Sequence, residues 1–324
     1  MLIIPMPRLL LFIIFSTITS AITAQQLSLF TQYREQAGII NPAALHSNYL
    51  LSEGDNNLHV GLSYRSQWTE LTTTPRTQVL NGSYFFDDSG AGVSFLAGGY
   101  LINDQTGPTG FTGGYLRLGG VVSDNPDYSG FAIGITAGAV QYRVDASEID
   151  LRDANDILGT QDQSQIFPDI GVGIYYYRQL ESGFLRDDYI YGGVSVPQVI
   201  GLELTFRGDE GEFFTQRLQH FYAQAGMIKY RNRDQTAFLE PSVWVKYVQG
   251  APINVDFNLR YQVAEPFWIG TGLSTGGNLH LETGFRLGQE DIFNIGYGFD
   301  YSFSSFGPFV GGTHELNLAV SLVR

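Results

Sequence analysis

Charged side chains occur at alternate positions within apolar runs in the C-terminal third of the chain. In residues 252–262, Asp256 and Arg260 share one phase with asparagine and glutamine, and apolar side chains fill the other phase. In residues 278–287, Glu282 and Arg286 occupy the polar phase in the same way. A strand directs successive side chains to opposite faces, so these acids and bases share a face and can pair there. The pattern predicts a lumen-type ionic network of Asp256, Arg260, Glu282 and Arg286.

Asp300 belongs to a third run of this kind, in which Gly296 and Gly298 share its phase. A buried carboxylate needs a partner, because an unpaired charge away from water is costly. Arg286 and Arg260 have the same phase on nearby segments. We therefore expect a structural salt bridge between Asp300 and one of these arginines.

Catalytic and metal-binding arrangements are not indicated. His314 and Glu315 are adjacent, so on a strand they point to opposite faces and chelate poorly. No Gly-x-Ser-x-Gly element is present, and no nucleophile shares the face of His314. The chain has no Cys, which removes thiolate metal sites and disulfides. We expect no enzyme activity, no cofactor and no metal. The acidic segment 145–162 lacks EF-hand spacing, and we interpret it as a solvated loop.

Period-2 alternation continues through most of the chain, and helical periodicity is hard to find. We predict fourteen strands in the following ranges: 57–68, 77–86, 90–102, 111–122, 130–144, 168–178, 188–197, 219–230, 237–248, 252–262, 266–274, 278–287, 292–302 and 313–323. The polar phase is sustained, and the chain is rich in Gly (39), Tyr (19) and Phe (23). A soluble β-sandwich also alternates, but these features favour an all-β, transmembrane, antiparallel up-and-down β-barrel of about 14 strands.

The N-terminus has the composition of a signal peptide. Arg8 precedes an apolar stretch from Leu9 to Ile18, and small residues follow up to Ala24. The stretch is short for a transmembrane anchor, which is the alternative interpretation. We therefore predict a signal peptide at 1–24, an N-terminal segment at 25–56 and a barrel at 57–324. The apolar residues of 25–56 predict order, either beneath the barrel or as a plug inside it.

The connections between predicted strands differ in length. If the mature N-terminus is periplasmic, the outward connections include 69–76, 103–110, 145–167, 198–218 and 303–312, and the inward ones are mostly shorter. Connections near 250 and 276 are short. We therefore predict that the outer rim of the barrel projects less from the membrane on that side than elsewhere. These features predict a multi-pass protein of a Gram-negative outer membrane, with the lipid bilayer as a partner. The net charge of −14 argues against nucleic acid as a partner.

Four motifs, in order, resemble the PorP/SprF family of the type IX secretion system of Bacteroidota. The first is Phe30-Thr31-Gln32-Tyr33, followed by Asn41-Pro42-Ala43. The second, Tyr64-Arg65-Ser66-Gln67-Trp68, lies at the end of the first predicted strand. The other two are Gly296–Ser302, which contains Asp300, and Gly312–Leu316, which contains His314 and Glu315. The chain departs from the family in having Leu27-Ser28 instead of an early acidic-Pro pair.

The resemblance implies a role in export or surface anchoring of a secreted adhesin that carries a type IX C-terminal sorting domain. Other components of the secretion or gliding machinery are the second class of partner that it implies. Whether the chain is a core component or a dedicated adhesin anchor stays open, and a channel for small or hydrophobic solutes is the alternative function. Aromatics in outward connections are the candidate partner-binding residues, namely Phe213, Phe214, Phe303, Phe306 and Phe309.

Arg65, Gln67 and Trp68 lie where the first predicted strand meets its outward connection. They could contact the exported partner or anchor the plug. The plainer interpretation is a network at the end of the strand, with Trp68 at the membrane interface.

Overall fold

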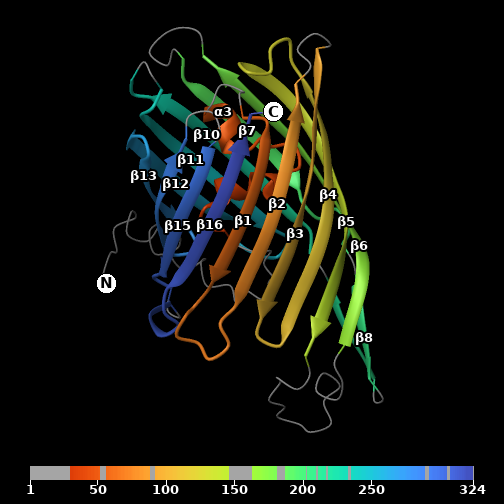
Figure 1. The fold of residues 1–324 in the computed structure, drawn as a ribbon. Coiled ribbons are helices and arrows are strands. Elements are labelled where there is room, and N and C mark those ends of the chain that lie inside the picture. The colour runs from red at the N-terminus through yellow and green to blue at the C-terminus, as the bar shows by residue number, and fades with distance from the viewer. Residues whose placement is uncertain are drawn as a thin grey trace, which may run out of the picture.

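Fourteen antiparallel strands close into a barrel (Figure 1). The computed structural model describes residues 30–51, 56–87, 92–145, 163–180, 187–201, 203–208, 211–216, 218–232, 235–288, 292–304 and 307–323. The barrel strands are β1 (Leu58–Ser66), β2 (Arg76–Phe86), β3 (Val93–Thr106), β4 (Thr109–Val122), β5 (Ser129–Val144), β6 (Gln163–Gln179), β7 (Tyr189–Val196), β10 (His220–Tyr230), β11 (Phe238–Val248), β12 (Asn254–Ala264), β13 (Phe267–Ser274), β14 (Asn278–Leu287), β15 (Ile292–Ser302) and β16 (Thr313–Leu322). The predicted fold class is confirmed.

Alternation along each strand separates an apolar outer surface from a polar lumen. On β12, Asp256, Asn258 and Arg260 are buried, whereas Phe257 and Leu259 are exposed on the outer surface. Leu116 on β4 is 74 % exposed, although water would disfavour that exposure. An apolar outer belt over a polar lumen is the arrangement of a barrel in lipid.

Closure occurs between the first and the last strand. β1 pairs with β16 from Leu58 opposite Leu322 to Ser66 opposite His314. All strand neighbours are antiparallel, and β7 pairs with β10 across the chain segment that separates them. Closure leaves no open edge in the wall, which is required when the surroundings cannot bond free backbone groups.

The barrel has two unlike ends. We call the end that carries the connections after β1, β3, β5, β7, β11, β13 and β15 the loop end, and the other end the turn end. The outward connection predicted at 103–110 is shorter than expected. β3 ends at Thr106 and β4 begins at Thr109, which leaves a two-residue turn. The glycine of that turn, Gly107, has φ 59°, a conformation that glycine adopts without strain. β3 to β6 are longer than β10 to β16, so the loop end is uneven, with its low side near 249–253 and 275–277.

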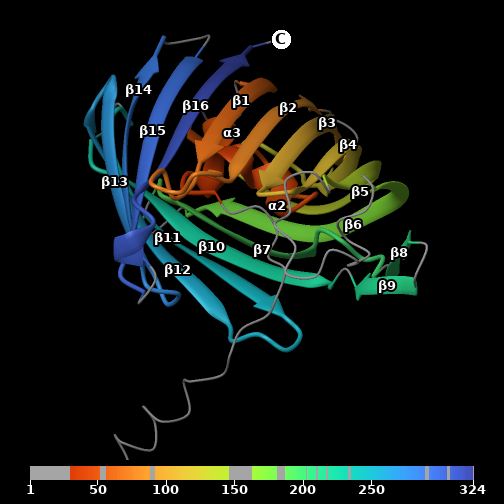
Figure 2. The same ribbon diagram turned by 90° about the horizontal axis from the view of Figure 1, so that it is seen from below.

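The connection after β7 contains a hairpin that the sequence reading missed. β8 (Glu203–Gly208) and β9 (Gly211–Gln216) pair with each other and form a separate two-stranded sheet at the loop end (Figure 2). Each strand has only six residues. β8 alternates, but the adjacent Phe213 and Phe214 break the alternation of β9. Connection 145–167 is also shorter than predicted, because β6 begins at Gln163.

Residues 30–51 lie within the ring of strands, and Figure 2 shows their helices inside it. We call this segment the plug. It contains a 3-10 helix, η1 (Tyr33–Gln36), and two short α-helices, α2 (Ala37–Ile40) and α3 (Ser47–Leu51). Helices of four or five residues are too short to show a period in the sequence. None of the helices in the described part of the chain is long and apolar enough to cross a membrane.

The apolar core is the interface between plug and wall. One cluster joins Tyr49, Leu50 and Leu51 of the plug to Phe85 and Phe238 of the wall. A second cluster joins Phe30, Tyr33 and Ile40 to wall residues that include Tyr115 and Trp244. Of the two places considered for the N-terminal segment, its described part occupies the lumen. The predicted signal peptide at 1–24 lies outside the described residues.

Candidate functional site: the plug and the loop end

The plug begins in the half of the lumen nearer the loop end, where it bonds the two closing strands. Glu315 on β16 accepts hydrogen bonds from the backbone N–H groups of Thr31 (2.7 Å) and Gln32 (3.1 Å). Arg65 on β1 ion-pairs with Glu315 (3.2 Å) and with Asp300 on β15 (2.6 Å). Arg65 also donates to the Thr31 hydroxyl, which in turn donates to Asp300 (2.9 Å).

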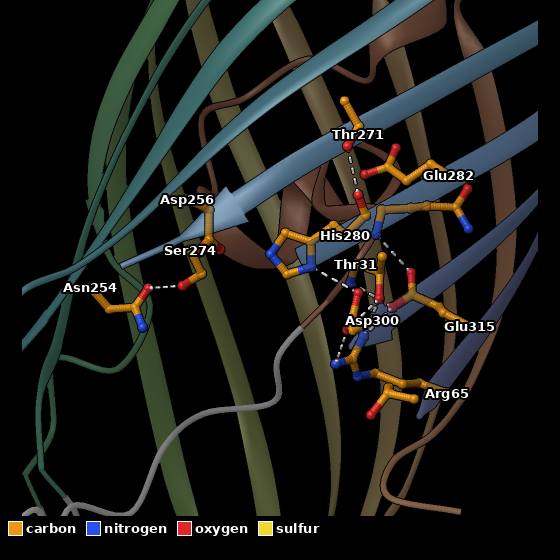
Figure 3. Close-up of polar contacts among 12 residues, drawn as sticks. Thr31, Arg65, Asn254, Asp256, Thr271, Ser274, His280, Glu282, Asp300 and Glu315 are labelled. Carbon is orange, nitrogen blue, oxygen red and sulfur yellow. Dashed lines mark hydrogen bonds and ion pairs between the residues drawn. The ribbon is translucent and has the colours of Figure 1, made fainter. Parts of the chain in front are cut away.

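Figure 3 shows Arg65, Asp300, Glu315 and Thr31 converging, with His280 on the far side of Asp300. The His280 imidazole lies 2.7 Å from an Asp300 carboxylate oxygen. The two wall glycines of this region face the plug closely: a Cβ at Gly298 would lie 2.8 Å from Thr31 Cγ2, and a Cβ at Gly296 would overlap the Gln32 side chain. Arg65 therefore anchors the plug, one of the roles considered for it from the sequence.

A second polar contact centres on Arg34 of η1. Its guanidinium lies 2.6 Å from Glu282 on β14 and 3.8 Å from Glu240 on β11. Arg260 on β12 pairs with Glu240 (2.6 Å) and with Glu35 of the plug (3.6 Å). All these groups are buried or nearly so. Burial opposes the charge of Arg34, but Glu282 and Glu240 outweigh burial and raise the pKa of Arg34, which therefore stays protonated.

The Asn41-Pro42 turn rests in a cradle of three wall glycines on β5, β6 and β7, namely Gly134, Gly173 and Gly193. A Cβ at Gly134 would overlap the Pro42 carbonyl, and one at Gly173 would overlap the Asn41 amide oxygen. Asn41 donates to the Ile174 carbonyl (2.9 Å) and accepts from the Ala43 N–H (2.9 Å). Both parts of the N-terminal motif, residues 30–33 and residues 41–43, therefore pack against glycines of the wall.

The end of the plug bonds the wall near the turn end. Asn48 donates to Ser321 on β16 (2.9 Å), and Tyr49 donates to Asp127 (3.4 Å) in the connection after β4. Arg117 on β4 donates to the carbonyls of Pro42 and Ala44. His46 stacks on His59 of β1 with 4.8 Å between ring centroids. Burial, then His59 and Arg117, hold the pKa of His46 well below its ordinary value, so His46 is neutral.

All four residues of the predicted lumen network, Asp256, Arg260, Glu282 and Arg286, line the lumen, but each ion-pairs with a residue outside this set. Asp256 pairs with Lys246 (2.5 Å), Arg260 with Glu240, Glu282 with Arg34, and Arg286 with Glu265 (3.7 Å). Asp300 pairs with Arg65 and not with the expected Arg286 or Arg260. The physical reason is that plug and wall supply closer partners than strands two or more positions away.

The remaining motif residues have structural contacts. Tyr33 donates to Ser242 (2.7 Å), and burial raises the pKa of Tyr33 to about 12. Tyr64 is exposed on the outer surface. The Gln67 N–H donates to the Pro75 carbonyl (2.9 Å), and the Trp68 N–H donates to Thr313 (3.4 Å).

His314 and Glu315 point to opposite faces of β16. The His314 imidazole lies 2.6 Å from the Tyr297 hydroxyl, and Glu315 faces the plug. In the described ranges, no group of three or more potential ligands could hold a metal ion.

The loop end presents aromatic side chains. Phe303 is 62 % exposed, and Phe309 is 78 % exposed at the end of a 3-10 turn, η5 (Gly307–Phe309). Val310 beside it is buried, and its carbonyl accepts from the Glu70 N–H (3.1 Å), so the turn is tied to the connection after β1. The backbone of Phe213 and Phe214 lies in β9, but their side chains are outside the described part. Phe306 and most of the acidic segment 145–162 are outside it too.

Arg34, Glu240, Lys246, Arg117 and the cradle glycines were missed by the sequence reading. For the wall residues the signal was their phase: Arg117, for example, stands between Leu116 and Leu118, which both face outward. Arg34 lies in η1 and had no such signal.

A closed barrel with an apolar outer surface and a plugged polar lumen defines a multi-pass protein of the outer membrane. The chain belongs to the PorP/SprF family of type IX secretion system membrane proteins, whose model matches residues 22–320. The family resemblance in the motifs is thereby confirmed, and the protein has a role in type IX secretion at the outer membrane. No match was found among curated proteins.

Solved structures similar to the chain are outer-membrane barrels. A deletion mutant of the monoaromatic hydrocarbon channel TodX shares 10 % identity, with 88 % of this chain and 93 % of that chain covered and a TM-score of 0.52. The translocator domain of the autotransporter NalP from Neisseria meningitidis shares 12 % identity over 82 % of this chain and 88 % of that chain, with a TM-score of 0.46. At such identities the likeness is one of fold.

Proposed function

We propose that this barrel supports export and surface anchoring of a partner adhesin by holding the adhesin's C-terminal sorting domain at the loop end. Family membership supplies the secretion system, and the adhesin is the class of partner that the motif resemblance implies. β16 ends at the turn end, and with that end in the periplasm the loop end faces the cell exterior. An adhesin that has crossed the membrane would meet the loop end.

The observation that carries the proposal is the exposure of Phe309. Its side chain is 78 % exposed in a turn that the neighbouring connection holds in place. Water disfavours such exposure, and a rigid aromatic is a common anchor of a protein interface. Phe303, which directly follows β15, is a second exposed aromatic at the loop end.

The contacts of the plug argue against the alternative, a diffusion channel for small or hydrophobic solutes. Withdrawing the plug would leave Glu282 and Glu315 without the plug groups that they bond. Buried charges that lose their partners cost several kcal/mol, about 3–5 in measured cases. A plug that is bonded this strongly to the wall disfavours an open channel, and it is compatible with a protein that binds its partner at the surface.

The test is retention of a tagged surface adhesin that carries a type IX C-terminal domain. The variant Phe303→Ser/Phe309→Ser should release the adhesin into the medium, because two aromatic anchors together contribute about 2 kcal/mol or more, roughly a thirtyfold change in affinity. The matched control is Phe293→Ser, which changes an exposed aromatic at the turn end of β15. Normal retention by a correctly inserted double variant would refute docking through these residues.

A further inference from the structure

A groove lies on the outer surface of the barrel, across β10 to β14, within the belt that faces lipid. It has one part nearer the loop end and one part nearer the turn end. Both parts are lined by Leu259 on β12 and Thr271 on β13, so they form one continuous hollow. Apart from one cation at its turn end, the side chains that face outward along the groove are almost all apolar.

The groove forms where small side chains stand outward between large ones. Ala225 on β10, Pro241 on β11 and Thr271 on β13 are the small ones, whereas Phe257 on β12 is large and 58 % exposed. The outward positions of β11 from 239 to 245 are all partly buried, because the neighbouring strands shelter them. β11 is therefore the floor of the groove.

A fixed arginine stands at the turn end of the groove. Arg231 directly follows β10, is exposed and lines this part. Its N–H donates to the Ala237 carbonyl (2.8 Å), and the Ala237 N–H donates to the Asn232 side chain (3.0 Å), so the connection that carries Arg231 is braced. Glu282 is the one acid among the described lining residues, and its carboxylate faces the lumen, where it pairs with Arg34 (2.6 Å). A guanidinium without an acid beside it in the groove suits a phosphate.

The length of the groove matches one leaflet of the membrane. Arg231 lies level with Ala237, and the groove reaches Val243 on the same strand, six residues further on. Six residues span about 20 Å along a strand, or about 15 Å along the membrane normal for a tilt of about 40°. This is about half of the hydrocarbon core. Tyr261 lines the part near Arg231, and tyrosine is typical of the headgroup level.

We propose that the groove binds one phospholipid of the periplasmic leaflet, with an acyl chain along β11 and the phosphate at Arg231. The groove is continuous with the surface that already contacts lipid, its walls are apolar, and its cation lies at the end where the headgroups of that leaflet lie. The bound lipid fills a hollow that the barrel's own side chains leave open. This site is separate from the loop end, and it does not depend on the function proposed above.

The first experiment measures lipid binding to the purified full-length barrel in detergent by native mass spectrometry. The delipidated barrel is offered dioleoyl phosphatidylethanolamine, or dioleoylglycerol, which has the same chains without the phosphate. We expect one phospholipid per barrel. Dioleoylglycerol should bind about tenfold more weakly or less, because it lacks the charge-assisted hydrogen bonds to Arg231.

Variants then locate the site. Arg231→Ala should remove the preference for the phosphate, whereas Arg178→Ala, which changes an exposed arginine at the turn end of β6, should keep it. Thr271→Trp fills the groove and should abolish binding of both probes, and Leu259→Trp is a second filling variant. Leu118→Trp adds the same ring to the outer surface of β4 and should leave binding unchanged. Heat-modifiable gel migration shows which variants are folded, and the folded ones decide.

Equal binding of the two probes by the wild-type barrel overturns the proposal. Loss of the preference in Arg178→Ala as in Arg231→Ala also overturns it, because lipid would then be attracted by any cation at the turn end. Lipid binding that the folded filling variants leave unchanged would indicate a non-specific lipid shell. A lipid-free dimer that Thr271→Trp dissociates would show that a second copy of the chain occupies the groove, and this too would refute the phospholipid site.

Discussion

Replacing Arg34 by methionine should loosen the plug strongly. Arg34 is 2.6 Å from Glu282 and provides the only ion pair of that carboxylate within the described ranges, whereas Glu240 keeps Arg260 at 2.6 Å. Arg34→Met therefore leaves one buried charge without its partner, which costs about 3–5 kcal/mol. If this cost destabilises only the docked state of the plug, the population with an undocked plug rises by about two orders of magnitude or more.

The chain has no Cys, so Leu50→Cys introduces a single thiol into the plug, at a position that is 2 % exposed. The rate of maleimide labelling of this thiol in the detergent-solubilised barrel then reports local opening. Arg34→Met should accelerate labelling about a hundredfold, and the exposed Arg76→Met should not. The double variant Arg34→Met/Glu282→Gln removes the stranded charge and should recover most of the protection. Equal labelling of the single and double variants would refute the electrostatic reasoning.

The other predictions concern the cradle, pH and the barrel itself. Gly173→Ala should displace Asn41 and speed labelling of the thiol that Leu50→Cys introduces, whereas Gly120→Ala, whose Cβ would meet nothing within 4 Å, should not. Docking keeps His46 neutral, with its pKa below the ordinary value of 6.5. Undocked chains therefore take up a proton below about pH 6.5 that docked chains do not, and docking weakens as pH falls from there. The labelling rate should rise by up to about tenfold for each pH unit that the pH falls, owing to protonation of His46. His46→Phe should make the labelling rate depend less on pH. Membrane-extracted protein should show strand-rich circular dichroism and heat-modifiable gel migration, and release into water without detergent would contradict the barrel.

The wall was predictable from the sequence because alternation is a local property. Asp256, Arg260, Glu282 and Arg286 were all assigned to the lumen by phase, and they are there. Most strand boundaries differ from the predicted ones by a few residues. Period 2 fixes the face of a side chain without reference to any other strand.

The pairings were not predictable in the same way. Asp300 bonds Arg65, which is 235 positions away, and Arg34 bonds Glu282, which is 248 positions away. Phase places Arg260 and Asp300 inside the barrel together, but β13 and β14 separate their strands. Which lumen residue meets which depends on the curvature of the wall and on the plug, and neither leaves a periodic trace.

The plug's bonds to both closing strands make it a latch for assembly. Glu315, Asn317 and Ser321 of β16 bond Thr31, Gln36 and Asn48, while Arg65 of β1 bonds Thr31. These partners lie on β16, which follows all the other barrel strands in the chain, so the latch cannot engage until that strand is in place. Seating of the plug against β16 therefore cannot precede the addition of that strand. A barrel that closes without its plug would keep the β1–β16 pairing and the Arg65–Glu315 ion pair, but Glu315, Asn317 and Ser321 would lose their plug partners.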